Sequence, residues 1–121
     1  MGKLTFEELR EANLSRGQRW HKGGLDEWSV AQWAVAAAGE MGEICNAVKK
    51  LDRIEDGIAN ISEPNRQLST REEAVRAIGA EIADTVIYLD LLSQRLGLDM
   101  AAEVSKKFNK VSLTYDFPER L

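Results

Sequence analysis

Two acidic residues stand out because they lie in a segment that is otherwise almost entirely apolar. Glu40 and Glu43 are three residues apart within VAQWAVAAAGEMGEICNAV, residues 30–48. If this segment is a helix, it is apolar nearly all round and we expect it to be largely buried. Both acidic side chains then share one face, with Cβ atoms roughly 5–6 Å apart. No Lys or Arg lies three or four residues from either one. The helix therefore offers these carboxylates no cation of its own.

Glu81 and Asp84 repeat this pattern within AIGAEIADTVIYLDLL, residues 77–92. They are again three residues apart, and again no Lys or Arg lies at helical spacing. An unpaired carboxylate on a buried apolar helix is unfavourable and tends to take up a proton. If the two helices face each other, the four groups repel one another unless a cation lies between them.

A hard divalent cation would remove this repulsion. Mg²⁺ prefers carboxylate oxygen and keeps several waters, which leaves positions open for a phosphate ligand. No His or Cys belongs to the set, which disfavours zinc. The four carboxylates thus predict a Mg²⁺ site suited to phosphoryl chemistry, in which Glu40 or Glu43 orients or deprotonates a water. The competing interpretation is that the two pairs simply lie on solvated helix faces.

Capping signals predict four helices that position these residues. Thr5 with Glu8 is a capping box, and Ser29 with Gln32 resembles another. Two candidate caps, Ser69 with Glu72 and Thr70 with Glu73, precede the third helix; Gly97 fits its C-terminal end, and Asp99 can cap the fourth. The predicted helices run from residue 6 to 20, 30 to about 54, about 70 to 96, and about 100 to 113.

The remaining segments are predicted to be irregular. HKGGLDEW (residues 21–28) is a glycine-punctuated loop, DGIANISEPNRQLS (56–69) is rich in turn residues, and TYDFPERL (114–121) contains a proline. No linker or repeat divides the chain. The pattern predicts an all-α fold, a four-helix bundle or part of one, in a single domain over residues 1–121.

Composition narrows the class of protein. The chain has 121 residues, 44% hydrophobic and 30% charged, which is typical of a globular domain. Its net charge of −4 disfavours a general binder of nucleic acid or membrane surfaces, but a bound metal would still admit an anionic substrate. The polar start of the chain has no apolar signal core, and residues 30–48 are interrupted by polar side chains, so we expect a cytoplasmic protein. Its small size favours an oligomer.

The two acidic pairs, taken with the residues around them, resemble the signature of a known family. GEMGE (39–43) followed by AEIADTVIYLDLLSQRLGLD (80–99) is similar to the MazG-like, all-α nucleoside triphosphate pyrophosphohydrolases, whose signature is ExxE, a spacer, then ExxD. The similarity extends through KKFNKVS and YDFPERL, and so covers about residues 29–121. It implies a four-helix bundle-like fold completed by oligomerisation, as a homodimer or homotetramer.

The resemblance also implies an activity. The substrate would be a nucleoside triphosphate, hydrolysed between the α and β phosphates to a monophosphate and pyrophosphate. The cofactor would be Mg²⁺ or Mn²⁺, held by Glu40, Glu43, Glu81 and Asp84. The tryptophan-containing front of the chain resembles MazZ-type viral members, which implies conversion of (d)GTP to (d)GMP in a host cytoplasm. A housekeeping role in the nucleotide pool is the alternative.

The chain departs from the family pattern in two places. The spacer between the half-motifs is longer, with the excess within EDGIANISEPNRQLS (55–69). Many relatives bind phosphate with the motif Lys-x3-Asn-x2-Arg late in the chain. Here Lys107 matches the lysine of this motif, but Val111 and Thr114 occupy the positions of the asparagine and the arginine. Asn109, Lys110 and Lys106 are therefore further candidates for phosphate, unless these residues are plain solvated surface.

Candidates for the rest of the substrate pocket each have a structural alternative. Asn46 could bind a base or ribose, or satisfy backbone groups, and Lys50 could reach phosphate. Trp33 could stack on a base or pack in the core. Trp20 could wall a ligand site beside the Gly23-Gly24 loop, or help His21 and Trp28 to anchor that loop. Cys45 is expected to pack in the core, and His21 is assigned no role in binding metal or moving protons.

Two other functions remain open at this point. Phosphoribosyl-ATP pyrophosphohydrolase belongs to the same superfamily and uses comparable carboxylates. A non-catalytic helical bundle that binds a divalent metal would show the same acidic residues. A ferritin-like di-iron bundle is disfavoured because it needs Glu-x-x-His pairs, and the single histidine lies outside both motifs.

Overall fold

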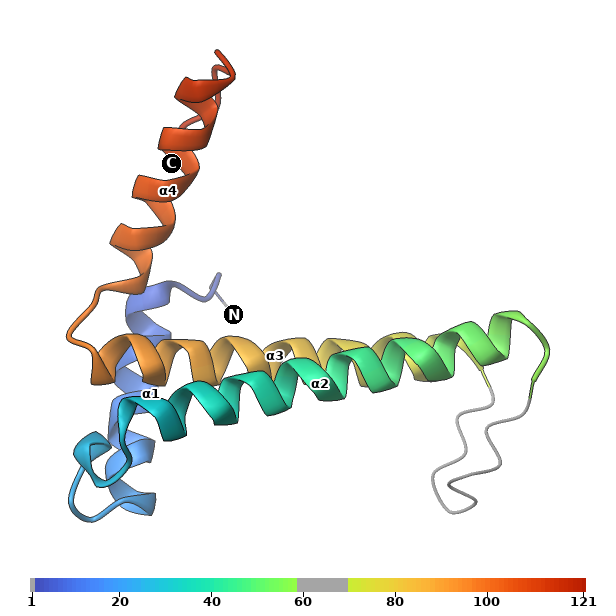
Figure 1. The fold of residues 1–121 in the computed structure, drawn as a ribbon, viewed down its shortest axis with the longest axis horizontal. Coiled ribbons are helices and arrows are strands. Elements are labelled where there is room, and N and C mark those ends of the chain that lie inside the picture. The colour runs from blue at the N-terminus through green and yellow to red at the C-terminus, as the bar shows by residue number, and fades with distance from the viewer. Residues whose placement is uncertain (1, 59–69) are drawn as a thin grey trace. The chain divides into compact units, whose positions relative to one another are not determined.

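The computed structural model describes residues 2–58 and 70–121, and every regular element within those ranges is helical. The elements are α1 (Phe6–Trp20), a 3₁₀ turn η1 (Leu25–Glu27), α2 (Val30–Glu55), α3 (Arg71–Arg95) and α4 (Met100–Thr114) (Figure 1). The prediction of an all-α chain is confirmed for these residues. None of the described helices combines the length and the apolar character needed to cross a membrane.

Three helices begin at caps that the sequence indicates, and α2 begins at Val30, directly after the predicted cap Ser29. The Thr5 hydroxyl accepts a hydrogen bond from the Glu8 amide (3.1 Å), and the Glu8 carboxylate accepts one from the Thr5 amide (2.8 Å). Asp99 accepts a hydrogen bond from the Ala102 amide at the start of α4 (3.2 Å). Of the two caps considered for α3, Thr70 accepts from the Glu73 amide (3.2 Å), while Ser69 lies outside the described residues.

Glycines end both α2 and α3 in the same way. Gly57 and Gly97 have φ angles of 76° and 71°, which a side chain would make unfavourable. After α3, the Leu98 amide donates to the Ser93 carbonyl (2.8 Å) and the Gly97 amide to the Gln94 carbonyl (3.0 Å), which is the Schellman pattern. The corresponding bonds end α2 at Gly57. These caps satisfy carbonyls that would otherwise lack a partner.

The predicted loop over residues 21–28 contains a helical turn that the sequence pattern did not predict. Gly24 has a φ of 79°, and its carbonyl accepts a hydrogen bond from the Glu27 amide (3.2 Å), which closes η1. Most of the turn-rich segment, residues 59–69, lies outside the described residues. The prediction that residues 114–121 are irregular is confirmed from Tyr115 onward.

The chain divides into two compact units. The first comprises Met1–Ala31 with Asp90–Leu121, and the second comprises Gln32–Leu89. The first unit thus contains α1, η1, the end of α3 and α4. The second contains most of α2 and most of α3, including all four candidate metal ligands. The prediction of one domain over the whole chain stays a prediction.

A buried polar network joins α1 to the end of α3 in the first unit. Asp90 and Asn13 are only 2% and 3% exposed. The Asp90 carboxylate accepts hydrogen bonds from the Asn13 amide (2.9 Å) and the Gln94 amide (2.8 Å). Gln94 also donates to the Arg10 carbonyl (3.1 Å). A buried carboxylate needs such donors, and here two elements far apart in the sequence supply them.

This network should contribute measurably to stability. Asp90→Ala leaves the buried Asn13 amide and the Gln94 amide without their common acceptor, and we expect a loss of about 2–3 kcal/mol in the free energy of unfolding. Asp90→Asn keeps an acceptor oxygen and should cost roughly half as much. Urea unfolding followed by circular dichroism measures both. Equal costs for the two variants would contradict the assignment of Asp90 as the shared acceptor.

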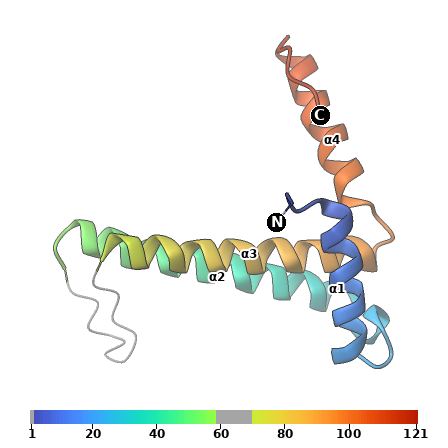
Figure 2. The same ribbon diagram turned by 180° about the vertical axis from the view of Figure 1, so that it is seen from behind.

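In the second unit α2 and α3 lie side by side and antiparallel (Figures 1 and 2). The ring centroids of Trp33 and Tyr88 lie 6.4 Å apart. At the C-terminal end of α2, the Glu55 carboxylate pairs with the Arg71 guanidinium at 3.3 Å. Ala47 and Ala74 are buried as well, at 8% and 0% exposure. Positions seven residues apart face the same way on a helix, so Trp33 and Ala47 belong to one inward row on α2, as Tyr88 and Ala74 do on α3.

The expectation that the second helix is largely buried is wrong for this chain. Of its described residues only Trp33, Ala37 and Ala47 are buried, whereas Val35 is 70% and Met41 50% exposed. Cys45 is exposed too, which contradicts its predicted core packing. The physical reason is that within its unit α2 packs against a single helix, so only one row of its side chains is covered.

Candidate metal centre

Three of the four predicted carboxylates gather in the second unit. Glu40 on α2 and Glu81 and Asp84 on α3 each have an oxygen within 4.8 Å of the others. Glu40 and Glu81 are half-buried, and Asp84 is exposed. The structure thus brings together residues about forty positions apart in the sequence, which helical spacing alone did not establish.

The inward rows of α2 and α3 explain this meeting. Glu40 lies midway between Trp33 and Ala47 in its row, seven residues from each, and Glu81 lies midway between Tyr88 and Ala74. The layer between an aromatic pair and an alanine pair is therefore made of two carboxylates. Asp84 follows Glu81 by three residues and lies on the same side of α3. The seam between the helices thus contains charged groups where apolar side chains would usually meet.

The electrostatics of this layer act on Glu40. Burial raises the pKa of Glu40 above its usual value, and the negative charges of Asp84, Glu81 and Glu43 raise it further. A hydrogen bond with the Glu81 side chain also raises the pKa of Glu40. All of these causes favour the neutral form of Glu40, so without a cation its surroundings oppose the ionisation of Glu40.

The donor set fits a hard divalent cation. All three gathered groups offer oxygen, and none offers nitrogen or sulfur. Among the ion pairs in the described ranges, Arg71 binds Glu55 and Arg95 binds Asp26; no basic side chain pairs with the three clustered carboxylates. Mg²⁺ or Mn²⁺ would supply the missing positive charge.

Glu43, the fourth predicted ligand, stands apart from the other three. It is exposed and lies one turn beyond Glu40, close enough for its charge to raise the pKa of Glu40. It does not belong to the group whose oxygens lie within 4.8 Å of one another. The predicted four-carboxylate set is therefore a cluster of three with a neighbouring fourth.

The other candidates on α2 differ in how accessible they are. Trp33 is 1% exposed, so its ring has no face open to a base, and the predicted stacking role is contradicted in favour of core packing. Asn46 and Lys50 are half-buried, one and two turns beyond Glu43. These two remain candidates for contacts with a nucleotide.

The predicted substrate residues on α1 and α4 belong to the first unit. Trp20 is 69% exposed, with the Arg16 guanidinium 5.1 Å from its ring centroid. Lys107 and Lys110 are exposed. Asn109 is the exception: its amide donates to the Leu121 carbonyl (3.1 Å) and its oxygen accepts from the Leu121 amide (2.8 Å). Asn109 is thus held by the C-terminal residue, and its contact with phosphate stays a prediction.

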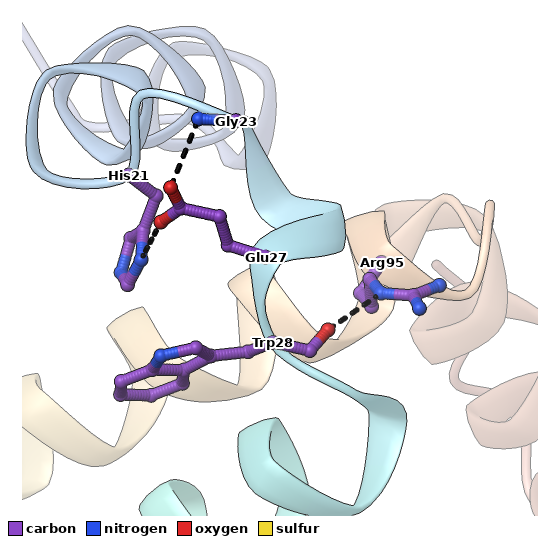
Figure 3. Close-up of polar contacts among 5 residues, drawn as sticks. All are labelled: His21, Gly23, Glu27, Trp28 and Arg95. Atoms are coloured by element: carbon purple, nitrogen blue, oxygen red, sulfur yellow. Dashed lines mark hydrogen bonds and ion pairs between the residues drawn. The ribbon is translucent and has the colours of Figure 1, made fainter.

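The loop between α1 and α2 is held by its own side chains (Figure 3). Glu27 accepts a hydrogen bond from the Gly23 amide (3.0 Å) and pairs with the His21 ring (3.0 Å). The His21 ring meets Trp28 edge-on, with centroids 4.9 Å apart. Arg95 donates to the Trp28 carbonyl (3.0 Å), which ties the loop to the end of α3. The His21 and Trp28 rings thus hold the loop together, and the main chain of Trp28 ties it to α3.

No protein-family model, curated protein or solved structure matches the chain. The family resemblance therefore rests on the sequence motifs alone. The function has to be argued from the carboxylate cluster and the residues around it.

Proposed function

We propose that this protein is a nucleoside triphosphate pyrophosphohydrolase that depends on a divalent metal. The observation that carries the proposal is the convergence of Glu40, Glu81 and Asp84 from two helices, without a basic partner in the described residues. The motif spacing supports it independently, because the ExxE and ExxD residues are those expected to bind metal in the MazG-like enzymes. We further propose the MazG-like form of the all-α fold, assembled as a homo-oligomer.

In the proposed mechanism the chain's own residues have distinct tasks. Glu40, Glu81 and Asp84 hold Mg²⁺, or Mn²⁺ in its place. When bound, the metal supplies neutralisation of the charge on the phosphate oxygens. Glu43 is left outside the cluster of three and orients the attacking water, accepting its proton. Lys50, on the same helix, is the residue that we propose binds phosphate.

The reaction adds one water to the substrate. A P–O bond forms from the water oxygen and a P–O bond of the α–β anhydride breaks, which yields a monophosphate and pyrophosphate. We propose (d)GTP as the preferred substrate and (d)GMP as the product. The proposed place of action is the cytoplasm, which for a viral protein is that of the host.

Product analysis tests this function. The purified protein is incubated with each of the eight common NTPs and dNTPs and with phosphoribosyl-ATP, in Mg²⁺ and again in EDTA, and the products are separated by ion exchange. We expect monophosphate and pyrophosphate in Mg²⁺ only, fastest with GTP or dGTP. Glu81→Gln at equal concentration is the control for a contaminating enzyme. Turnover of phosphoribosyl-ATP alone would support the other superfamily activity, and no turnover at all would leave a metal-binding bundle.

A further inference from the structure

The segment after α4 turns back along the helix and is held there by one side chain (Figures 1 and 2). We call residues 117–121 the strap. The Asn109 amide donates to the Leu121 carbonyl (3.1 Å), and the Asn109 oxygen accepts from the Leu121 amide (2.8 Å). Two residues paired across antiparallel β-strands exchange the same two kinds of bond. Asn109 thus binds the main chain of the strap as a neighbouring strand would.

The direction of the strap is set by hydrogen bonds at its start and within it. Among the described residues Asp116 is the one residue other than glycine with a positive φ (57°). The next amide, that of Phe117, donates to the Ser112 carbonyl (2.8 Å), which ends α4 and turns the chain back. Arg120 then donates to the Phe117 and Glu119 carbonyls (2.7 Å each). These bonds give the strap a defined course back toward the helix.

Little apolar burial holds the strap closed. The Phe117 and Leu121 side chains are 54% and 65% exposed, so closing the strap removes little of their surface from water. The two hydrogen bonds to Asn109 are the described contact between the end of the strap and α4. One hydrogen bond in water shifts an equilibrium by about two- to tenfold. Two such bonds keep the strap closed most of the time and still allow it to open.

Three lysines lie within three residues of Asn109 on α4, namely Lys106, Lys107 and Lys110. All three are exposed, and in the part of the chain that the structure describes none of them forms an ion pair. Residues three and four apart are neighbours on a helix surface, so Lys106 adjoins both Asn109 and Lys110. Ammonium and amide N–H groups are donors to phosphate oxygens. This part of α4 therefore offers donors for a phosphate group, and the strap is bound to one of them.

We propose that the strap competes with phosphate for Asn109 and so regulates anion binding on α4. With the strap closed, the amide and the oxygen of Asn109 are both engaged by the main chain of Leu121, which fixes this side chain toward the strap. With the strap open, the amide turns toward a phosphate group that Lys106 and Lys110 attract. The anion therefore binds the open form more tightly and shifts the protein toward it.

The inference rests on the proposed function only for the choice of anion, because the substrate and one product of that reaction contain pyrophosphate. The competition has two measurable consequences. The apparent dissociation constant is the intrinsic one divided by the open fraction, so a variant with a weakened strap should bind pyrophosphate more tightly. By linkage, pyrophosphate must open the strap by the same factor by which the closed strap weakens its binding.

Calorimetric titration with inorganic pyrophosphate, in metal-free buffer of low ionic strength, tests the first consequence. Without metal the carboxylate cluster repels the anion, so binding reports on the lysines of α4. Leu121→Pro removes the amide that donates to Asn109 and should bind pyrophosphate about two- to tenfold more tightly than the wild type. Leu121→Ala keeps both main-chain bonds and should bind as the wild type does. Equal affinity of Leu121→Pro and the wild type would overturn the proposal, as would the absence of binding in both.

Two further measurements separate Asn109 from the strap. Asn109→Ala opens the strap but also removes the amide, so it should bind pyrophosphate more weakly than Leu121→Pro. If the two variants bind equally well, Asn109 does not contact the anion and the proposal is wrong. In the wild type, hydrogen exchange followed by NMR should find the Leu121 amide protected, and this protection should be lost as pyrophosphate is added. Protection that persists at saturating pyrophosphate would overturn the proposal even if a variant failed to fold.

These results are separable from those of the nucleotide assay. Strap-dependent binding of pyrophosphate in a protein that hydrolyses no nucleotide would refute the proposed function and support the competition. Hydrolysis of nucleotides together with pyrophosphate binding that is the same in Leu121→Pro and the wild type would support the function and refute the competition.

Discussion

Glu40→Gln is expected to make the metal-free protein more stable and at the same time to abolish its metal-dependent hydrolysis. Burial and the negative charges of Asp84, Glu81 and Glu43 all oppose an ionised Glu40. A neutral amide of the same shape removes this repulsion. Half-exposed charges interact by about 0.2–1 kcal/mol, which corresponds to a rise in Tm of roughly 1–5 °C for a chain of this size. Loss of a metal ligand should lower turnover by ~10²-fold or more.

The pH dependence of this difference has a definite sign. The pKa of Glu40 is raised in the folded state, so below that value the folded protein binds more protons than the unfolded chain does. Wild-type stability therefore rises, relative to Glu40→Gln, as the pH falls through the raised pKa. Above it the cost of the charge is constant. The difference in Tm between variant and wild type should be largest near pH 7 and shrink toward pH 4.5, the ordinary value for a glutamate.

Thermal unfolding in EDTA across this pH range, together with the nucleotide assay, measures both effects. Glu55→Gln is the matched control, because Glu55 lies on the same helix but pairs with Arg71 at 3.3 Å. It should lower Tm slightly or leave it unchanged, with turnover intact. Millimolar Mg²⁺ should raise the Tm of the wild type and not that of Glu40→Gln. A Glu40→Gln protein that is less stable at pH 7 would show that the cluster is not a site of charge repulsion.

The ends of the helices could be predicted because their causes are local. Thr5, Thr70 and Asp99 each bind an amide three residues further along, within reach of any sequence window. The Schellman ending at Gly97 is equally local. The 3₁₀ turn at residues 25–27 was missed because it depends on the positive φ of Gly24, and two adjacent glycines indicate a turn without fixing its type.

The carboxylate cluster was predictable because its evidence is an energetic conflict visible in the sequence. Acidic residues on an apolar helix without a nearby cation are unfavourable. The clustering of Glu40, Glu81 and Asp84 gives them a common explanation, because together they could hold a metal ion. Asp90 lies in an equally apolar run but was not singled out. The Asp90 carboxylate can be buried because it accepts a hydrogen bond from Asn13, 77 residues earlier, and no local pattern reveals that donor. The hydrogen bonds between Asn109 and Leu121 were missed for the same reason, because these two residues are 12 positions apart.

Burial of the second helix could not be read from its composition. Apolar residues on several faces indicate that something covers them, but not whether the cover comes from the same chain. Within its unit α2 covers one row against α3 and leaves Met41, Cys45 and Val48 exposed. In the homo-oligomer proposed above, a second chain would cover part of this apolar surface.

Trp33→Ala is expected to cost the protein a large part of its stability. Trp33 is 1% exposed and is the largest apolar side chain among the buried residues described. Truncating a buried tryptophan costs about 3–5 kcal/mol through lost transfer energy and the cavity it leaves. Since the total free energy of unfolding of small proteins is ~5–15 kcal/mol, this loss should lower the Tm of the variant markedly. Urea unfolding followed at 222 nm measures the loss, and Trp33→Phe, which keeps an aromatic ring beside Tyr88, should recover a large part of it.

Trp20→Ala is the control for Trp33→Ala, because it removes an exposed tryptophan instead of a buried one. Trp20 is 69% exposed and its described ring contact is with Arg16, so its removal should cost no more than the ~0.5–1 kcal/mol of an exposed cation–π pair. The two tryptophans should also differ in their effect on catalysis. If Trp20 lines the base pocket, Trp20→Ala raises KM with little effect on Tm. Trp33→Phe, in contrast, should change Tm with little effect on KM. A folded, fully stable Trp33→Ala protein with a raised KM would reverse that assignment and return Trp33 to the substrate.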